Sequence, residues 1–307
     1  MTTTPIPEHA ELELAVGAEP VARSQWQLFW RRFFKHRVAV ASAVILVIIV
    51  VACMFASVFA PYNPKDIDLS LIGVVKGPSW KHLMGTTDLG TDQFSQILYA
   101  GQISLKIGIF VALFSTLVGV SIGAAAGYFG GIIDRLLSAM TDTFLVIPQL
   151  AILAVLLQYF GHGEWVITFV LAALGWTYVA RVSRGQVLSF KEKEFVEAAR
   201  AAGATAPRII VRHILPNMVG PIMVNLSLSV AGAIITESTL TFLGYGIQPP
   251  DSSWGLMLSQ NEGAVNNPEK MHLLLFPGFM LLIVVMCVNF LGDGLRDAFD
   301  PQAKHTN

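Results

Sequence analysis

Long apolar stretches separated by shorter polar ones run through most of this chain. The clearest covers residues 38–60, where the only polar members are Ser42 and Ser57. A helix needs about 20 mostly apolar residues to cross a hydrocarbon core of roughly 30 Å, so each such stretch is a candidate span. Further candidates lie near residues 103–128, 136–160, 165–182, 217–243 and 273–292. The pattern predicts an all-α polytopic membrane protein with six transmembrane helices.

Composition supports this prediction. Hydrophobic residues make up 54% of the 307 residues and charged residues 13%, whereas soluble domains contain roughly 45–50% and 25%. So few charges could not cover a water-exposed surface, but they suit a protein whose surface is largely in contact with lipid. The first apolar stretch is longer than the about 7–15 residues of a signal peptide core, so we expect it to be a retained anchor.

The 20 Lys and Arg residues are divided unequally between the two sides that six spans define. Both termini and the loops 129–135 and 183–216 share a side with 15 of them, the other side has 4, and Lys106 lies at a boundary. Positive residues concentrate in the cytoplasm, so we expect a multi-pass protein of the cell (cytoplasmic) membrane with both termini cytoplasmic. The formal net charge of −1 gives no indication of a nucleic-acid partner, and we expect none.

The segments around the spans predict a domain organisation. Residues 1–23 are acidic and contain several Pro, so we expect a disordered cytoplasmic tail. Residues 24–37 combine five aromatic side chains with basic ones, which suits an amphipathic helix in the inner headgroup layer; the alternative is a basic flank without a helix. The first span and an outer segment occupy 38–101, a second outer segment covers 245–272, and 298–307 form a cytoplasmic tail.

Sequence motifs of enzymes are absent or misplaced. No Lys is followed by Ser or Thr, so the chain has no P-loop for ATP, and HExxH is absent. The two cysteines, Cys53 and Cys287, lie far apart in apolar stretches and indicate neither a disulfide framework nor a metal site. Ser121 stands in one GxSxG pattern, but inside an apolar stretch instead of a strand-to-helix turn. We therefore expect no catalytic residues, metal site or cofactor in this chain.

The same pattern has a simpler explanation. Gly119, Gly123 and Gly127 are spaced by four residues and so share one face of a helix. Small residues on one face let a neighbouring backbone approach closely. These glycines therefore predict tight helix–helix packing.

The longest cytoplasmic loop reads KEKEFVEAARAAGATAPRIIVRHILPN. Residues 194–202 are strong helix formers, and Gly203 tolerates the left-handed backbone that ends many helices. Thr205 and Pro207 then suit the N-cap and first turn of a second short helix. We expect a compact projection whose first helix exposes Glu197 to a partner. The alternative is an ordinary solvated basic loop.

This loop resembles the EAA loop of ABC importer permeases. The matching positions are Glu197–Ala198–Ala199, Gly203 and Leu215–Pro216, while His213 stands where the usual pattern has Ile. In that family the loop forms the coupling helix that docks in a cleft of the ATPase subunit. The resemblance implies that Glu197 and the Ala face contact the ATPase and that Gly203 sets the turn.

Three further segments are similar to the C-type permeases of the dipeptide/oligopeptide importer family. They are residues 84–105, 237–258 and 291–301, although Thr91 and Gln96 stand where that family usually has Arg. The resemblance implies a type I ABC importer permease core at 102–297, preceded by one extra N-terminal span. It also implies a heterodimer with a homologous permease subunit, two cytoplasmic ATPase subunits and an extracytoplasmic solute-binding protein. Di- or oligopeptides are the expected cargo; nickel, a glycoside or another small solute is the alternative.

Ionisable residues within the spans are the remaining candidates for function. Asp142 and Glu237 lie inside predicted spans, and such groups normally face the protein interior or a water-filled path. We expect them either to line the pathway or to form inter-helix hydrogen bonds. A secondary transporter would instead show ionisable pairs near the midplane and inverted repeats, and we find neither in the sequence.

Overall fold

The computed structural model describes residues 25–64 and 66–299. The acidic segment 1–23 and most of the expected C-terminal tail, residues 300–307, lie outside the described residues. The described part is helical, and its only β-type pairing is an isolated antiparallel bridge between Thr86 and Asp92. Five helices are long and apolar enough to cross a bilayer, and a sixth span results if one bent helix pair is counted as one. The chain is a multi-pass membrane protein.

The first two helices follow one another almost without a break. Helix α2 covers Gln25–Lys35 and α3 covers Arg37–Met54, with His36 between them. The rings of Phe29 on α2 and Phe299 lie 4.4 Å apart, so α2 packs on the end of the last helix. A helix is therefore present where residues 24–37 predicted one, and its position in the headgroup layer stays a prediction.

Helix α5, Gln93–Phe129, is the longest at 37 residues. It begins at Asp92, whose carboxylate accepts hydrogen bonds from the amide and the hydroxyl of Ser95, both at 2.8 Å. This N-cap satisfies free amides of the first turn. The domain boundary expected between residues 101 and 102 therefore falls inside α5. The pattern of apolar residues does not reveal where a helix begins if its first turns are polar.

Pro148 lies inside the candidate span 136–160 and predicts an interruption there, which the structure shows as a sharp bend. Helix α6, Gly131–Val146, and helix α7, Gln149–Phe160, meet at an angle of 85°. Pro148 occupies the break, and Ile147 before it has an extended backbone with ψ of 132°. A residue that precedes proline is driven out of the helical region, which ends α6 here.

The remaining long helices are continuous. They are α8 (Glu164–Lys191), α12 (Val219–Phe242) and α14 (His272–Phe299). Gly175 does not interrupt α8; a Cβ built on it would lie 2.6 Å from the hydroxyl of Ser115 on α5, so this glycine permits a close crossing. The short helical elements are α4 (Ala56–Phe59), η1 (Leu69–Leu71), α9 (Glu194–Ala201), α10 (Ala206–Ile209), η2 (Ile210–Ile214), α11 (Leu215–Asn217), α13 (Trp254–Gln260), η3 (Glu262–Asn266) and η4 (Pro268–Lys270).

The close packing predicted for the glycine face of α5 is confirmed, and its partner is α8. A Cβ on Gly119 would lie 2.7 Å from the carbonyl oxygen of Trp176, and one on Gly127 would lie 2.9 Å from that of Arg184. Gly123, between them, faces the backbone of Ala180. These three glycines let the two helices pack backbone against backbone along their C-terminal halves.

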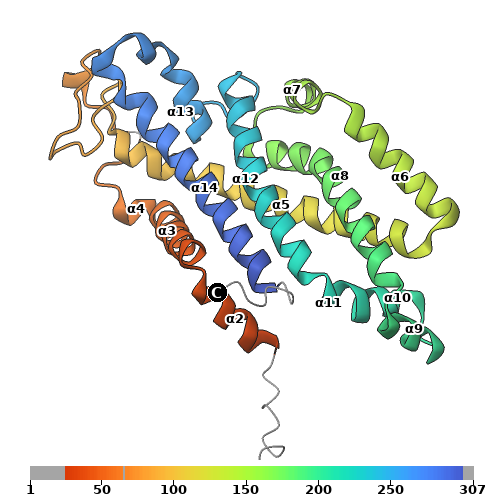
Figure 1. Ribbon diagram of the computed structural model, residues 1–307. Coiled ribbons are helices and arrows are strands. Elements are labelled where there is room, and N and C mark those ends of the chain that lie inside the picture. Colours follow the sequence, from red (N-terminus) through yellow and green to blue (C-terminus); the bar gives the residue numbers. More distant parts are fainter. Residues whose placement is uncertain (1–24, 65, 300–307) are drawn as a thin grey trace, which may run out of the picture.

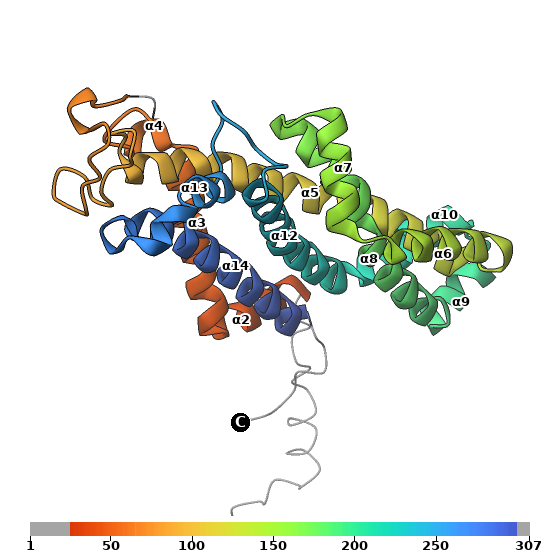
Figure 2. The same cartoon turned by 90° about the horizontal axis from the view of Figure 1, so that it is seen from above.

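The helices place the two predicted outer segments together at one end of the molecule (Figures 1 and 2). The side chain of Gln93, at the start of α5, donates to the carbonyl of Leu273, at the start of α14. Lys270 forms an ion pair with Asp88 at 2.5 Å, which joins the two outer segments directly. The short helices α9 and α10 lie at the opposite end in both views.

Candidate functional site

The loop predicted to couple to an ATPase is a compact projection built on a small apolar core. Val196 of α9 is completely buried, as are Ile209 and Ile214 from the second half of the loop. They pack in one cluster with Ala124 of α5 and Val187 of α8. A force applied to α9 therefore reaches the ends of two long helices through close-packed side chains.

The turn at Gly203 has the predicted left-handed conformation, with φ of 78°. The amide of Ala204 donates to the carbonyl of Ala199, and the amide of Gly203 donates to that of Arg200, both at 3.0 Å. These two bonds define a Schellman motif, in which the glycine position requires positive φ. Thr205 holds the N-cap position of α10, as predicted, although its side chain makes no capping hydrogen bond there.

The other residues of the predicted coupling set lie on the surface of this projection to different degrees. Glu197 and Ala198 are exposed, whereas Ala199 is partly buried against the apolar core. Of the later residues, His213 and Leu215 are half-buried and Pro216 is exposed. Glu197 and Ala198 thus belong to the accessible surface of α9, and their contact with an ATPase stays a prediction.

A π-helical turn at Ile210–Ile214 was not predicted from the sequence. The amide of Leu215 donates to the carbonyl of Ile210, five residues back. Pro216 follows directly and has no amide proton to donate, so it cannot continue the ordinary i−4 pattern. Pro216 could have indicated the π-turn from the sequence, because it interrupts the ordinary helical hydrogen bonding. Such π-turns are frequent at functional sites.

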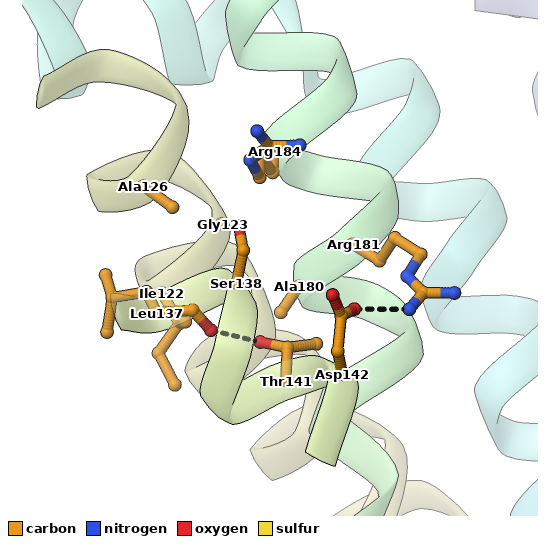
Figure 3. A pocket seen from close by; sticks show the side chains of 10 residues that line it. All are labelled: Ile122, Gly123, Ala126, Leu137, Ser138, Thr141, Asp142, Ala180, Arg181 and Arg184. Atoms are coloured by element: carbon orange, nitrogen blue, oxygen red, sulfur yellow. Dashed lines mark hydrogen bonds and ion pairs between the residues drawn. The ribbon is translucent and has the colours of Figure 1, made fainter. Parts of the chain in front are cut away.

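Asp142 forms an ion pair with Arg181 of α8, with 2.5 Å between the carboxylate and guanidinium atoms (Figure 3). Two turns earlier on α6, Asp134 binds Arg184 with both carboxylate oxygens, at 2.5 and 2.8 Å. No local sequence pattern marks Asp134 as a candidate, because its partner lies 50 residues away. Together the two pairs join α6 to α8 beside a cavity of about 270 Å³.

Both members of the Asp142–Arg181 pair are accessible in the isolated chain. Their side chains are 60% and 58% exposed, whereas those of Asp134 and Arg184 are 19% and 37% exposed. The cavity between α5, α6 and α8 is also lined by residues with small side chains: Gly123, Ala126, Ala180, Ser138 and Thr141 (Figure 3). The structure thus places Asp142 in a contact between α6 and α8 whose side chains remain exposed in the isolated chain.

Glu237 of α12 is completely buried. Its carboxylate accepts hydrogen bonds from the hydroxyls of Thr241 at 2.9 Å, Ser238 at 3.2 Å and Ser104 of α5 at 3.3 Å. The structure therefore places Glu237 in an inter-helix hydrogen-bond network. Asp142 and Glu237 have no hydrogen-bond partner in common among the described residues. Among the described residues, no group of three or more His, Cys, Asp or Glu is arranged to hold a metal ion.

Comparison with known proteins gives a consistent result over nearly the whole chain. Residues 119–305 match the family described as the binding-protein-dependent transport system inner membrane component. Residues 24–73 match the N-terminal TM domain of oligopeptide transport permease C. The oligopeptide transport system permease protein OppC of Haemophilus influenzae is 40% identical over 280 residues, which are 91% of this chain and 89% of that protein.

A second relative and a solved structure agree. The oligopeptide transport system permease protein OppC of Mycobacterium tuberculosis is 38% identical over 283 residues, or 92% of this chain and 96% of that protein. Inward-facing conformations of the MetNI methionine ABC transporter share the fold, with a TM-score of 0.55 and 18% identity over 67% of this chain and 97% of that one.

Proposed function

Because this chain belongs to the family of inner-membrane components of binding-protein-dependent transport systems, we propose that it is a permease subunit that imports oligopeptides. The observation that carries the substrate class is the similarity to two oligopeptide permeases along more than nine-tenths of the chain. The extra N-terminal span belongs to the same similarity.

Members of such a family work with an ATPase and a solute-binding protein. For this chain we propose a heterodimer with a homologous permease, two cytoplasmic ATPase subunits that hydrolyse the ATP, and one extracytoplasmic binding protein. The 15-to-4 distribution of Lys and Arg supports both termini and the 183–216 loop on the cytoplasmic side. In that orientation α9 faces the ATPases, and the segments 61–92 and 245–272 face the binding protein.

The coupling step follows from the packing of the projection. Closure of the ATPases would push the exposed face of α9, where Glu197 and Ala198 lie. Because Val196 packs in one buried cluster with Val187 of α8 and Ala124 of α5, the push would move α8 and α5 together as a rigid body. Rigid-body motion of this kind alternates access between the two sides of a membrane.

The exposure of the Asp142–Arg181 ion pair indicates what covers this side of α6 and α8 in the assembled transporter. Exposed charged groups at bilayer depth are unfavourable against lipid by about 2.5–3.5 kcal/mol each, so another subunit or a water-filled path normally covers them. Both side chains are more than half exposed in the isolated chain. We therefore infer that this side of α6 and α8 faces the homologous subunit or the shared pathway.

Uptake by the reconstituted complex tests the function. The complex with its natural partners is placed in proteoliposomes with the binding protein outside and ATP inside, and labelled peptides of two to eight residues, nickel and a glycoside are offered separately. ATP-dependent uptake of peptides alone supports the proposal. Uptake of nickel or the glycoside in place of peptides would reject the substrate class. Uptake driven by an ion gradient without ATP would reject the importer itself.

A further inference from the structure

Glu237 carries a network that extends beyond the transmembrane helices. Its carboxylate accepts the hydroxyls of Ser104, Ser238 and Thr241, and two of these hydroxyls also bind the segment that follows α12. Three hydroxyls from α5 and α12 thus converge on one buried carboxylate. No ion pair among the described residues includes Glu237, so hydroxyl donors take the place of a cation.

Two of these hydroxyls also accept a backbone amide from the segment that follows α12. Ile247 donates to Thr241 at 3.1 Å, and Trp254 donates to Ser104 at 3.2 Å. A hydroxyl has one proton to donate. Each of the two therefore connects an outer-segment amide to the carboxylate of Glu237.

The outer segment is seated tightly where these bonds form. Trp254 is completely buried, and its indole nitrogen donates to the carbonyl of Ile97 on α5 at 3.0 Å. A Cβ on Gly255 would lie 2.6 Å from the Cα of Ser238 on α12. The start of α13 consequently has no room to shift against α5 or α12 while the network is intact.

We propose that Glu237 is a positioning residue that fixes the outer segment 246–257 to the outer ends of α5 and α12, so that the three move together during transport. A buried carboxyl group is unfavourable unless it is well hydrogen-bonded. Loss of its acceptor oxygens would leave the buried hydroxyls that bind the outer segment without a partner, which is also unfavourable. The link to transport rests on the proposed function, whereas the connection itself does not.

Amide hydrogen exchange of the assembled complex tests the connection directly. In the variant Glu237→Gln one carboxylate oxygen becomes an amide group that cannot accept a hydroxyl proton. We expect exchange of amides 246–257 to accelerate by about tenfold, the factor for a buried donor that loses its acceptor. Ser104→Ala removes only the hydroxyl of α5 and should accelerate the same amides to a smaller extent. Thr236→Val is the matched control, because that hydroxyl bonds only to Gly232 within α12.

The role in transport is measured on the same samples as the ratio of ATP hydrolysis with and without loaded binding protein. Both network variants should lower this ratio at least fivefold, while Thr236→Val leaves it unchanged. If exchange of 246–257 stays at the parent rate in both variants, the connection is rejected. If exchange accelerates and the ratio stays normal, the positioning role is rejected. A parent complex that shows neither ATP stimulation nor uptake rejects the proposed function, and the exchange result still decides the connection.

Discussion

Gly123 of α5 lies so close to α8 that a Cβ atom built on it would be 2.8 Å from the amide nitrogen of Arg184. Backbone atoms cannot move aside as a flexible side chain can, so any larger residue must push the two helices apart. The α5–α8 pair also includes the ends that contact the projection around α9. This single contact therefore connects membrane packing with the proposed coupling site.

We expect Gly123→Ala to destabilise the protein by roughly 1–3 kcal/mol, the usual range for overpacking. Gly185→Ala in α8 is the matched control, since a Cβ there has nothing within 4 Å. The control should unfold at the parent temperature or slightly above it, because alanine favours helix. The midpoint of thermal unfolding in detergent gives the comparison, and equal midpoints for both variants would contradict the packing argument.

The two ion pairs between α6 and α8 should differ in strength. Asp134 binds Arg184 through two oxygens and is mostly buried, so Asp134→Asn should cost about 1–2 kcal/mol. The Asp142–Arg181 pair is more than half exposed in the isolated chain, so Asp142→Asn should cost less than about 1 kcal/mol there.

Thermal unfolding of the separately purified chain measures both effects on the α6–α8 contact. The double variant Asp134→Asn/Arg184→Gln should lose less than the sum of the single variants, because it leaves no unpaired partner. A larger loss for Asp142→Asn than for Asp134→Asn would contradict the ranking.

Labelling of single cysteines should establish the orientation. Cys53 and Cys287 are buried, so the background should be low. We expect Gln260→Cys, at the end of the outer helix α13, to react with a membrane-impermeant reagent added to intact cells. Arg200→Cys on α9 should react only after the membrane is opened. Labelling of residue 200 from outside would invert the topology and remove the coupling argument.

Replacement of Gly203 should separate the turn from the spans. Its φ of 78° is unfavourable for a β-branched residue, so Gly203→Val should cost about 1–2 kcal/mol of local strain. We expect insertion to be normal and transport to be strongly reduced. Gly203→Asn is the matched control, because asparagine adopts this conformation readily and should retain most transport. Normal transport by the valine variant would show that the turn is not needed for coupling.

Charge reversal at Glu197 tests the proposed contact with the ATPase. Like charges placed opposite each other at an interface cost several kcal/mol. Glu197→Lys should therefore lower transport at least tenfold and reduce the ATPase content of the purified complex, while pairing with the other permease persists. Glu262→Lys, an exposed charge reversal in η3 at the opposite end, should leave ATPase content unchanged. A parental ATPase content in the Glu197 variant would place this residue outside the interface.

Local patterns in the sequence determined a large part of this protein. Apolar length alone identified the membrane-spanning segments, because the bilayer sets a fixed requirement on each segment independently of its neighbours. The spacing of Gly119, Gly123 and Gly127 predicted a close-packed face, and Gly203 predicted a left-handed turn, since backbone geometry depends on adjacent residues. None of these inferences needed a distant contact.

Tertiary structure decided which distant residues meet. The glycine face could have met any helix, and only the fold selected α8. Pro148 indicated an interruption, but the 85° bend depends on what packs around it. Glu237 left two interpretations open until the fold brought Ser104, which is 133 residues away, into hydrogen-bond distance. Sequence patterns specify the conformation of a segment, whereas the partners of a buried charge are chosen by packing across the whole chain.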